Sequence, residues 1–235
     1  MNVLGHIHVA LAGGRDDPEY LLGAVLPDLA PMAGVRLRAR SGLPGSVGEG
    51  VRCHLRADRA FHAHAGFRDG AAALRRAVAA AGVASGPSRA VGHAGWELLL
   101  DGTLVGTEVE RAFHGAVLTA GEQAGGALAP GDRARWAAFL ARARGGGSLR
   151  YDEPRWVADR LHAMLARRPR LRLPEHQVAA VADALAAAAA GVVAAAPAVL
   201  GDTALAAAPP VVPAGTPLAA GSPPRPPAGR GPGLA

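Results

Sequence analysis

The chain contains a single isoleucine, Ile7, and this scarcity is the sequence feature that most restricts its fold. Only 4% of the 235 residues are aromatic, so alanine and leucine must fill much of the interior. Sandwiches and barrels of β-strands are rich in Val, Ile, Thr and aromatic residues. The composition therefore argues against an all-β fold and predicts an all-α fold whose helices pack closely through small side chains.

Helical patterns cover most of the chain. Prolines at positions 18, 87, 154 and 174, together with Asp132 and Asp152, stand where helices typically begin. The expected helices span residues 2–12, 18–26, 48–81 with a bend near Gly66, 88–104, 107–125, 132–144, 154–167 and 174–200. The stretches 41–47 and 145–147 predict loops.

A change of composition near residue 205 separates a folded part from a tail. Residues 209–235 are mostly Ala, Pro and Gly and offer few side chains that could be buried. The chain length suits one domain. We therefore expect one helical domain over residues 1–205 and a disordered Ala/Pro/Gly-rich tail over residues 206–235.

The charge and the cysteine content bear on partners and location. The formal net charge is +6, and all 25 basic residues are arginines. Such an excess usually favours a polyanionic partner, but the absence of lysine indicates a GC-rich coding bias, so no nucleic-acid partner is expected. Cys53 is the only cysteine, which argues against a disulfide framework and makes the reducing cytoplasm the expected location.

Two apolar stretches raise the question of a membrane. Residues 178–200 are long enough to cross a bilayer, but Asp183 lies inside this run and Pro197 breaks it, so we expect a packed helix and no membrane partner. Residues 1–14 lack a basic start and contain His6 and His8, which argues against a signal peptide.

The sharpest pattern is a pair of stripes of histidines and acids. His54, Asp58 and His62 are four residues apart, and each step of four rotates a side chain by only about 40° around a helix. A second stripe has the same spacing and consists of His93, Glu97 and Asp101. Imidazoles and carboxylates from two facing helices can hold a divalent ion inside a bundle.

An isolated His–Asp pair at this spacing is more often a surface salt bridge. Two stripes beside apolar residues favour a metal site, because burying so many ionisable groups without a metal is costly. His6 and His8 point about 200° apart on a helix, so only one faces inward; we select His6, although either could be an ordinary core histidine. Asp28 could join the site, but its spacing also fits a turn aspartate.

Several segments occur in the order found in a known family. They are Met1-Asn2-Val3-Leu4-Gly5-His6-Ile7-His8-Val9-Ala10, Leu22-Gly23 through Asp28, Gly50-Val51-Arg52-Cys53-His54-Leu55-Arg56-Ala57-Asp58, Trp96-Glu97 and Arg167-Arg168-Pro169-Arg170-Leu171. This series, within residues 1–173, resembles the acyl carrier protein phosphodiesterases, also called ACP hydrolases, which are HD-like metal-dependent phosphohydrolases.

The resemblance implies an HD-like helical bundle and a metal-dependent phosphoric diester hydrolase. In that family the enzyme removes 4′-phosphopantetheine from the serine of holo acyl carrier protein, which would be the partner. The positions that match the family are His6, Asp28, His54, Asp58 and Glu97. We expect catalytic roles for Asp28 and Asp58. The expected metal ligands are His6, Asp28, His54, Asp58, His62, His93 and Glu97.

The sequence departs from the family at three positions. Acids stand in the family at the positions of His62 and His93, and a histidine stands at the position of Leu98. The ligand set is therefore richer in nitrogen, which shifts the preference from Mg²⁺ toward Mn²⁺, Fe²⁺ or Zn²⁺. We expect a divalent metal, with Mn²⁺ first.

A divalent ion can neutralise the anionic oxygens of a phosphodiester and activate a water. Arg52 and Arg56 flank the first stripe and could bind phosphate oxygens, although a solvated helix face is the alternative for each. Two other functions stay open: an HD-like phosphohydrolase that acts on a nucleotide or a phospholipid head group, and a non-enzymatic basic module that binds an acidic partner.

Overall fold

The computed structural model describes residues 1–38, 43–144 and 149–208. Within these residues the fold is all-α, as predicted, with no strands. The α-helices are α1 (Val3–Ala12), α2 (Pro18–Met32), α3 (Gly45–Ala63), α4 (Ala65–Ala80), α5 (Ser85–Gly102), α6 (Glu108–Ala120), α7 (Arg133–Arg144), α8 (Pro154–Leu165) and α9 (Val178–Ala207). Short 3-10 turns span Gln123–Gly126, Pro169–Leu171 and Glu175–Gln177.

Two predicted helix ends are wrong. The helix that begins at Pro18 does not end at residue 26 but continues to Met32 through Pro27 and Pro31. The helix expected over residues 174–200 is not broken at Pro197 and extends past residue 200 to Ala207. In both helices the residues beside the prolines are buried, for example Ala196 beside Pro197, and this tertiary packing outweighs the loss of a few backbone hydrogen bonds.

The predicted bend near Gly66 is a break. The chain leaves the helical conformation at His64, with φ −68° and ψ 132°, so the expected helix 48–81 is the pair α3 and α4. The expected helix 107–125 likewise ends at Ala120 and is followed by a 3-10 turn.

The predicted loops and tail lie partly outside the described residues. The expected loop 41–47 is shorter than predicted, because α3 already begins at Gly45, and residues 41 and 42 are not described. The expected loop 145–147 and residues 209–235 of the expected tail also lie outside the described residues. Since α9 extends to Ala207, the described helix passes the predicted domain end at residue 205 by two residues.

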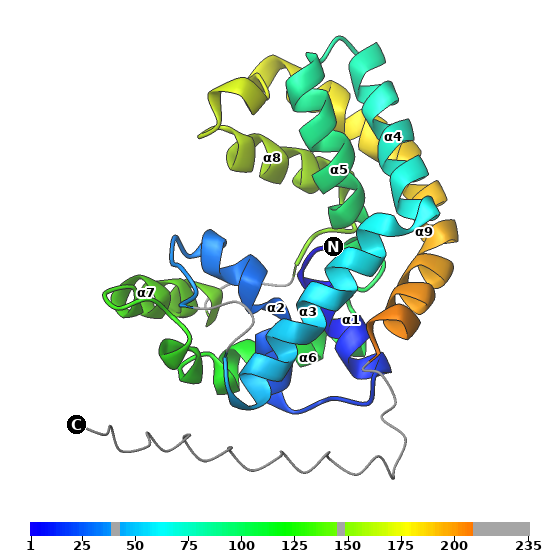
Figure 1. Cartoon of the computed structure of the whole chain (residues 1–235). Coiled ribbons are helices and arrows are strands. Elements are labelled where there is room, and N and C mark those ends of the chain that lie inside the picture. The colour runs from blue at the N-terminus through cyan, green and yellow to red at the C-terminus, as the bar shows by residue number, and fades with distance from the viewer. Residues whose placement is uncertain (39–42, 145–148, 209–235) are drawn as a thin grey trace, which may run out of the picture.

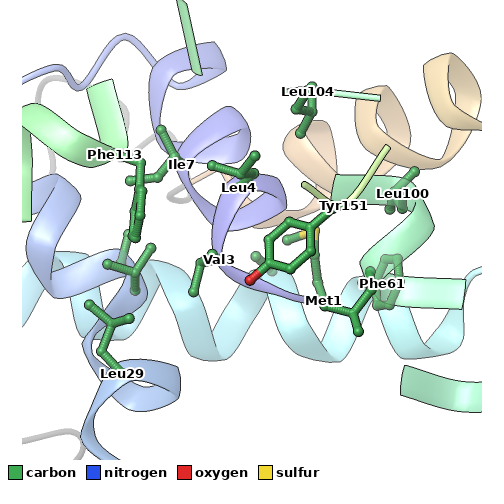
Figure 2. Packing of buried hydrophobic residues seen from close by; sticks show 14 of the residues in the cluster. Met1, Val3, Leu4, Ile7, Leu29, Phe61, Leu100, Leu104, Phe113 and Tyr151 are labelled. Atoms are coloured by element: carbon green, nitrogen blue, oxygen red, sulfur yellow. The ribbon is translucent and has the colours of Figure 1, made fainter. Parts of the chain in front are cut away.

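Two groups of helices meet at the N-terminal segment. Figure 1 shows α4, α5 and α8 at one end of the molecule and α2, α6 and α7 at the other, with α1 and α3 between them. The long α9 packs against α1, α3, α4, α5 and α8, while α2 packs against α1, α3 and α6. The core around α1 contains Leu4 and Ile7 together with Phe61 of α3 and Leu100 of α5, all buried (Figure 2).

Glycines let α2 and α3 approach each other closely. A Cβ atom on Gly50 would lie 2.1 Å from the carbonyl oxygen of Tyr20, and one on Gly23 would lie 2.2 Å from the carbonyl oxygen of Val47. Any larger side chain would therefore force the two backbones apart. This contact fixes the separation between the side chains that α2 and α3 contribute to the site.

Candidate metal centre

Three helices bring together the residues that we call the inner trio, which are His6 of α1, Asp28 of α2 and His54 of α3. One ligand atom from each of them lies within 4.8 Å of the others. Oδ2 of Asp28 is 3.7 Å from Nε2 of His6, and Oδ1 is 4.0 Å from Nε2 of His54. The two imidazole rings stack with their centroids 3.8 Å apart. Asp28 therefore belongs to a helix and to this cluster, and the turn alternative for it is wrong.

Backbone carbonyls orient both imidazoles. His54 Nδ1 is 2.9 Å from the carbonyl oxygen of Ala24, and His6 Nε2 is 3.1 Å from that of Met1. A carbonyl oxygen only accepts, so each of these nitrogens donates. His6 Nδ1 and Asp28 Oδ2 are buried and have no hydrogen-bond partner among the described residues. Buried polar atoms in proteins are normally paired, so the inner trio has capacity to bind a further group.

Burial is the main cause of the pKa shifts in the inner trio. Burial raises the pKa of Asp28 to about 7; the carboxylates of Asp58, Glu97 and Asp101 act in the same direction, and the Met1 amino group opposes them. An accumulation of negative charge around a buried carboxylate makes the binding of a cation favourable.

The pKa of His6 is shifted downward, whereas that of Asp28 is shifted upward. Burial lowers the pKa of His6 well below its usual value, and the neighbouring His54 lowers it further. His6 is therefore neutral at pH 7. A neutral imidazole is the form that binds metal ions.

A second cluster, the outer trio, contains His62 of α3 together with His93 and Glu97 of α5. Oε1 of Glu97 lies 3.1 Å from Nε2 of each histidine, and these two nitrogens are 3.2 Å apart. The outer trio is more accessible than the inner one, since the His93 side chain is 52% exposed. Its donor set again comprises two imidazoles and one carboxylate, which suits Mn²⁺, Fe²⁺ or Zn²⁺ better than Mg²⁺.

Asp58 belongs to neither trio but lies beside the outer one. Its Oδ1 is 3.3 Å from Nδ1 of His62 and 3.1 Å from the amino nitrogen of Met1, and this nitrogen also lies 3.1 Å from Oε1 of Glu97. Burial alone would raise the pKa values of Asp58 and Glu97, but the hydrogen bonds from His62 and the charge of the amino group hold both pKa values well below their usual range. Hydrogen bonds to Asp58 and Glu97 raise the pKa of His62 to about 9.

The residues of one predicted stripe do not all belong to the same cluster in the structure. Each step of four residues turns by about 40°, so two steps turn by about 80° and the ends of a stripe face different neighbours. For this reason His54 joins the inner trio and His62 the outer one. Asp101, at the far end of the second stripe, is fully buried and accepts hydrogen bonds from the backbone N–H groups of Leu4 at 2.8 Å and Gly5 at 2.9 Å. Asp101 thus holds the first turn of α1 against α5.

The remaining histidines lie outside both trios. His8 is absent from either cluster, and burial lowers its pKa. His64 accepts a hydrogen bond from the N–H of Gly66 through Nδ1 and contacts Asp202 of α9 at 3.2 Å through Nε2. His114 lies 3.5 Å from Glu110.

The two arginines proposed to bind phosphate make contacts to the backbone. Arg52 donates to the carbonyl oxygen of Leu43 at 3.2 Å. Arg56 donates from Nε to the carbonyl oxygen of Ala207 at 2.8 Å and so ties the end of α9 to α3. These contacts give both arginines a structural role at the ends of helices.

Sequence spacing did not reveal the part played by Met1. Its amino group joins Asp58 to Glu97, and its carbonyl oxygen orients His6. No periodic pattern marks backbone atoms as members of a site. The three-dimensional arrangement is needed to find them.

Comparison with known proteins gives no similar protein from which a function could be transferred. No family model, no curated protein and no solved structure matches the chain. The function is therefore inferred from the two trios and the sequence motifs.

Proposed function

We propose that this protein is a divalent-metal-dependent phosphodiester hydrolase with an HD-like arrangement of its helices. The observation that carries the proposal is the inner trio, in which ligand atoms from three helices lie within 4.8 Å of one another. The resemblance of the sequence motifs to acyl carrier protein phosphodiesterases supports the same reaction class.

The donor chemistry of the inner trio fits a divalent ion. His6, Asp28 and His54 offer two imidazoles and one carboxylate, and two of their polar atoms are buried without a partner among the described residues. Nitrogen donors favour Mn²⁺, Fe²⁺ or Zn²⁺ over Mg²⁺. We propose Mn²⁺ as the first choice.

Asp58 and Asp28 would then have different roles in hydrolysis. A bound divalent ion supplies positive charge for the phosphate oxygens and lowers the pKa of a water. Asp58 is ionised at neutral pH, because its pKa is held low, and we propose that it orients the attacking water and accepts its proton. Asp28 would hold the ion in the buried part of the site.

His62 is suited to act as the proton donor. Its pKa is raised to about 9, chiefly by the hydrogen bond to Asp58, so the imidazole carries a proton at neutral pH. We propose that it donates this proton to the oxygen of the leaving group. The outer trio also offers a second set of metal ligands, but His62 must release its proton before it can bind an ion.

The proposed substrate is holo acyl carrier protein, and the proposed products are the apo form and 4′-phosphopantetheine. This assignment rests on the family resemblance, whereas the reaction class rests also on the two trios. The exposed His93 and the partly exposed His62 of the outer trio leave a phosphodiester on a large substrate free to approach from solvent.

The test is to strip the protein with a chelator, restore it with Mn²⁺ and incubate it with holo acyl carrier protein. Mass spectrometry should detect conversion of the holo form to the apo form. A parallel assay uses bis(p-nitrophenyl) phosphate, which reports phosphodiester cleavage without recognition of a protein substrate. Cleavage of this compound alone would retain the reaction class and remove the substrate assignment.

The test variant is Asp28→Asn, which keeps the side-chain shape and removes a negative charge that binding of a cation requires. Circular dichroism should show unchanged helicity in this variant while both activities are lost. A protein that binds no Mn²⁺, Fe²⁺ or Zn²⁺ at micromolar concentration and cleaves neither compound would overturn the proposal.

A further inference from the structure

An apolar cavity whose lining includes no residue of either trio lies between α2, α6 and α7. This cavity has a volume of about 590 Å³. Its lining is largely apolar and includes Leu29, Met32, Phe113, Val117, Phe139 and Leu149. Residues 145–148, which follow α7, lie outside the described part of the chain. Small-molecule sites typically have this size and are lined mainly by apolar side chains with a few polar groups.

Two residues that line the cavity, Val3 and Leu29, lie close along the chain to residues of the candidate metal centre. Leu29 follows Asp28 of the inner trio on α2, and Val3 is two residues from Met1, whose amino group contacts Asp58. Figure 2 shows the Val3 side chain between Phe113 and the ring of Tyr151.

Tyr151 lines the cavity and is buried. Burial raises the pKa of its hydroxyl to about 12, and the negative charges of Asp101 and Asp28 contribute to that rise. Tyr151, a residue of the cavity lining, therefore lies within the electrostatic range of Asp28 of the inner trio.

Two large apolar side chains of the cavity lining are exposed to solvent. Met32 is 45% exposed and Leu118 is 49% exposed. A recess lined mainly by apolar side chains is the usual form of a small-molecule site. Arg111 lies beside them and makes no ion pair within the part of the chain that the structure describes.

The carboxylate of Glu110 does not make the wall polar. It accepts hydrogen bonds from the backbone N–H groups of Gly106 at 2.7 Å and Leu149 at 2.9 Å, and it lies 3.5 Å from His114. Because backbone groups bind this carboxylate, the wall offers mainly aliphatic and aromatic surface to a ligand.

We propose that this cavity binds an unbranched aliphatic chain carried by the phosphodiester substrate. The proposal rests on the proposed function and names the substrate class more closely: a phosphodiester whose reacting group meets the trios while its acyl or alkyl chain occupies the cavity. The chain could belong to an acylated phosphopantetheine or to a phospholipid. Flexible linings that contain Met and Leu adapt well to such chains.

Chain binding is measured first without metal or hydrolysis. The probe is Nile red, an uncharged apolar dye, displaced from the chelator-treated full-length protein by n-alcohols of increasing length. Affinity should rise about fourfold for each added methylene until the cavity is full, because burial of a CH₂ group is worth about 0.8 kcal/mol. An affinity that does not depend on chain length overturns the proposal.

Leu118→Asp and Leu205→Asp form a matched pair of variants. Both residues are exposed, so both variants should fold, but only Leu118 lines the cavity, whereas Leu205 is on α9. Leu118→Asp should weaken displacement by long alcohols at least tenfold, and Leu205→Asp should leave it unchanged. Val117→Trp, which fills the cavity from α6, should have the same effect as Leu118→Asp. Equal displacement in all three variants overturns the proposal.

Activity assays then separate this proposal from the proposed function. Asp58→Asn should lose hydrolysis but retain chain binding, whereas Leu118→Asp should retain cleavage of bis(p-nitrophenyl) phosphate and lose any preference for chain-bearing substrates. If chains bind and no phosphodiester is cleaved, the cavity assignment stands and the proposed function falls.

The source of the chain is decided by two substrates, acylated holo acyl carrier protein and a lysophospholipid. The proposal expects a lower KM for one of them than for its chainless counterpart, and this difference should disappear in Leu118→Asp. A KM that is equal with and without the chain for both substrates contradicts the proposal, even if Nile red is displaced.

Discussion

Oδ1 of Asp28 lies 4.0 Å from Nε2 of His54, although the two residues belong to different helices. This distance depends on the glycine contact between α2 and α3, where the backbones of Tyr20 and Gly50 nearly touch. The spacing of the inner trio is thus set by main-chain packing more than by the length of the ligand side chains.

The first prediction concerns this contact. Gly50→Ala places a Cβ atom 2.1 Å from the carbonyl oxygen of Tyr20, so α2 and α3 must separate. We expect the free energy of unfolding to fall by about 1–3 kcal/mol, as for other overpacked sites, and Mn²⁺ affinity to fall with it. Urea unfolding and a metal titration measure the two effects.

The control for Gly50→Ala is Gly115→Ala on α6, where a Cβ atom would meet nothing within 4 Å. Alanine stabilises a helix interior by about 0.5–1 kcal/mol relative to glycine, so this variant should be as stable as the wild type or more so. Unchanged metal affinity in Gly50→Ala would show that the glycine contact does not set the ligand spacing.

The second prediction concerns Asp58. Replacing it by Asn keeps the side-chain shape but removes the negative charge beside Met1 and His62. We expect phosphodiesterase activity to fall by orders of magnitude while helicity survives, with partial recovery at high Mn²⁺ if metal affinity is also reduced. Steady-state kinetics and circular dichroism provide the measurements.

His176→Gln is the control for Asp58→Asn, because His176 is exposed in a 3-10 turn outside both trios. Its activity should match that of the wild type. Near-normal turnover in Asp58→Asn would remove Asp58 from the mechanism.

The third prediction concerns metal binding by the inner trio. Free Mn²⁺ at one hundred times its Kd should raise the free energy of unfolding by about 2.7 kcal/mol. Asp28→Asn should abolish this gain, and the double variant Asp28→Asn/His54→Gln should lose little more, because ligands of one ion act as a unit. Thermal unfolding with and without Mn²⁺ tests the prediction.

Glu97→Gln in the same assay addresses the outer trio. If this trio holds a separate ion, the variant should bind about one ion fewer by elemental analysis and keep the stabilisation due to the inner trio. Loss of the whole Mn²⁺ effect in Glu97→Gln would instead mean that the two trios act as one site.

The fourth prediction concerns pH. Burial raises the pKa of Asp101 to about 7, above the ordinary value of 3.8. Between these pH values the native state therefore holds a proton that the unfolded state has released, and the Asp101 contribution to the free energy of unfolding falls as the pH rises from about 4 to about 7.

Asp101→Asn removes this titration. The variant loses a hydrogen bond to Leu4 or Gly5 and should be less stable than the wild type at pH 5 by about 1–3 kcal/mol. The deficit should shrink by pH 8, because the wild type then carries a buried charge. Urea unfolding at both pH values gives the difference, and a deficit that is constant or grows with pH would contradict the raised pKa.

The sequence was sufficient for the all-α class and for most helix ranges, because alanine-rich periodicity and caps are local signals. It was insufficient at Pro27, where burial of the neighbouring turns sustains α2 beyond its predicted end, and at the end of α9, which extends past residue 200 to Ala207. Local propensity favours a helix end at a proline, and only the tertiary contacts reverse that preference.

The four-residue spacing predicted that acids and histidines share a helix face, but it could not assign them to partners. His54 and His62 differ by about 80° in direction, which is enough to place them in different trios. The close approach of α2 and α3, the hydrogen bonds from α1 to Asp101 and the contacts of the Met1 backbone depend on the packing of whole helices. None of these has a periodic signature.

The bonds from α3 and α4 to the end of α9 also have a consequence for the order in which the molecule forms. Arg56 reaches Ala207 across 151 positions and His64 reaches Asp202 across 138. During synthesis the ribosome must therefore complete nearly all of α9 before these bonds can close. Until then α3, which carries His54, Asp58 and His62, lacks its distal support, so a nascent chain should acquire a rigid site only late in translation.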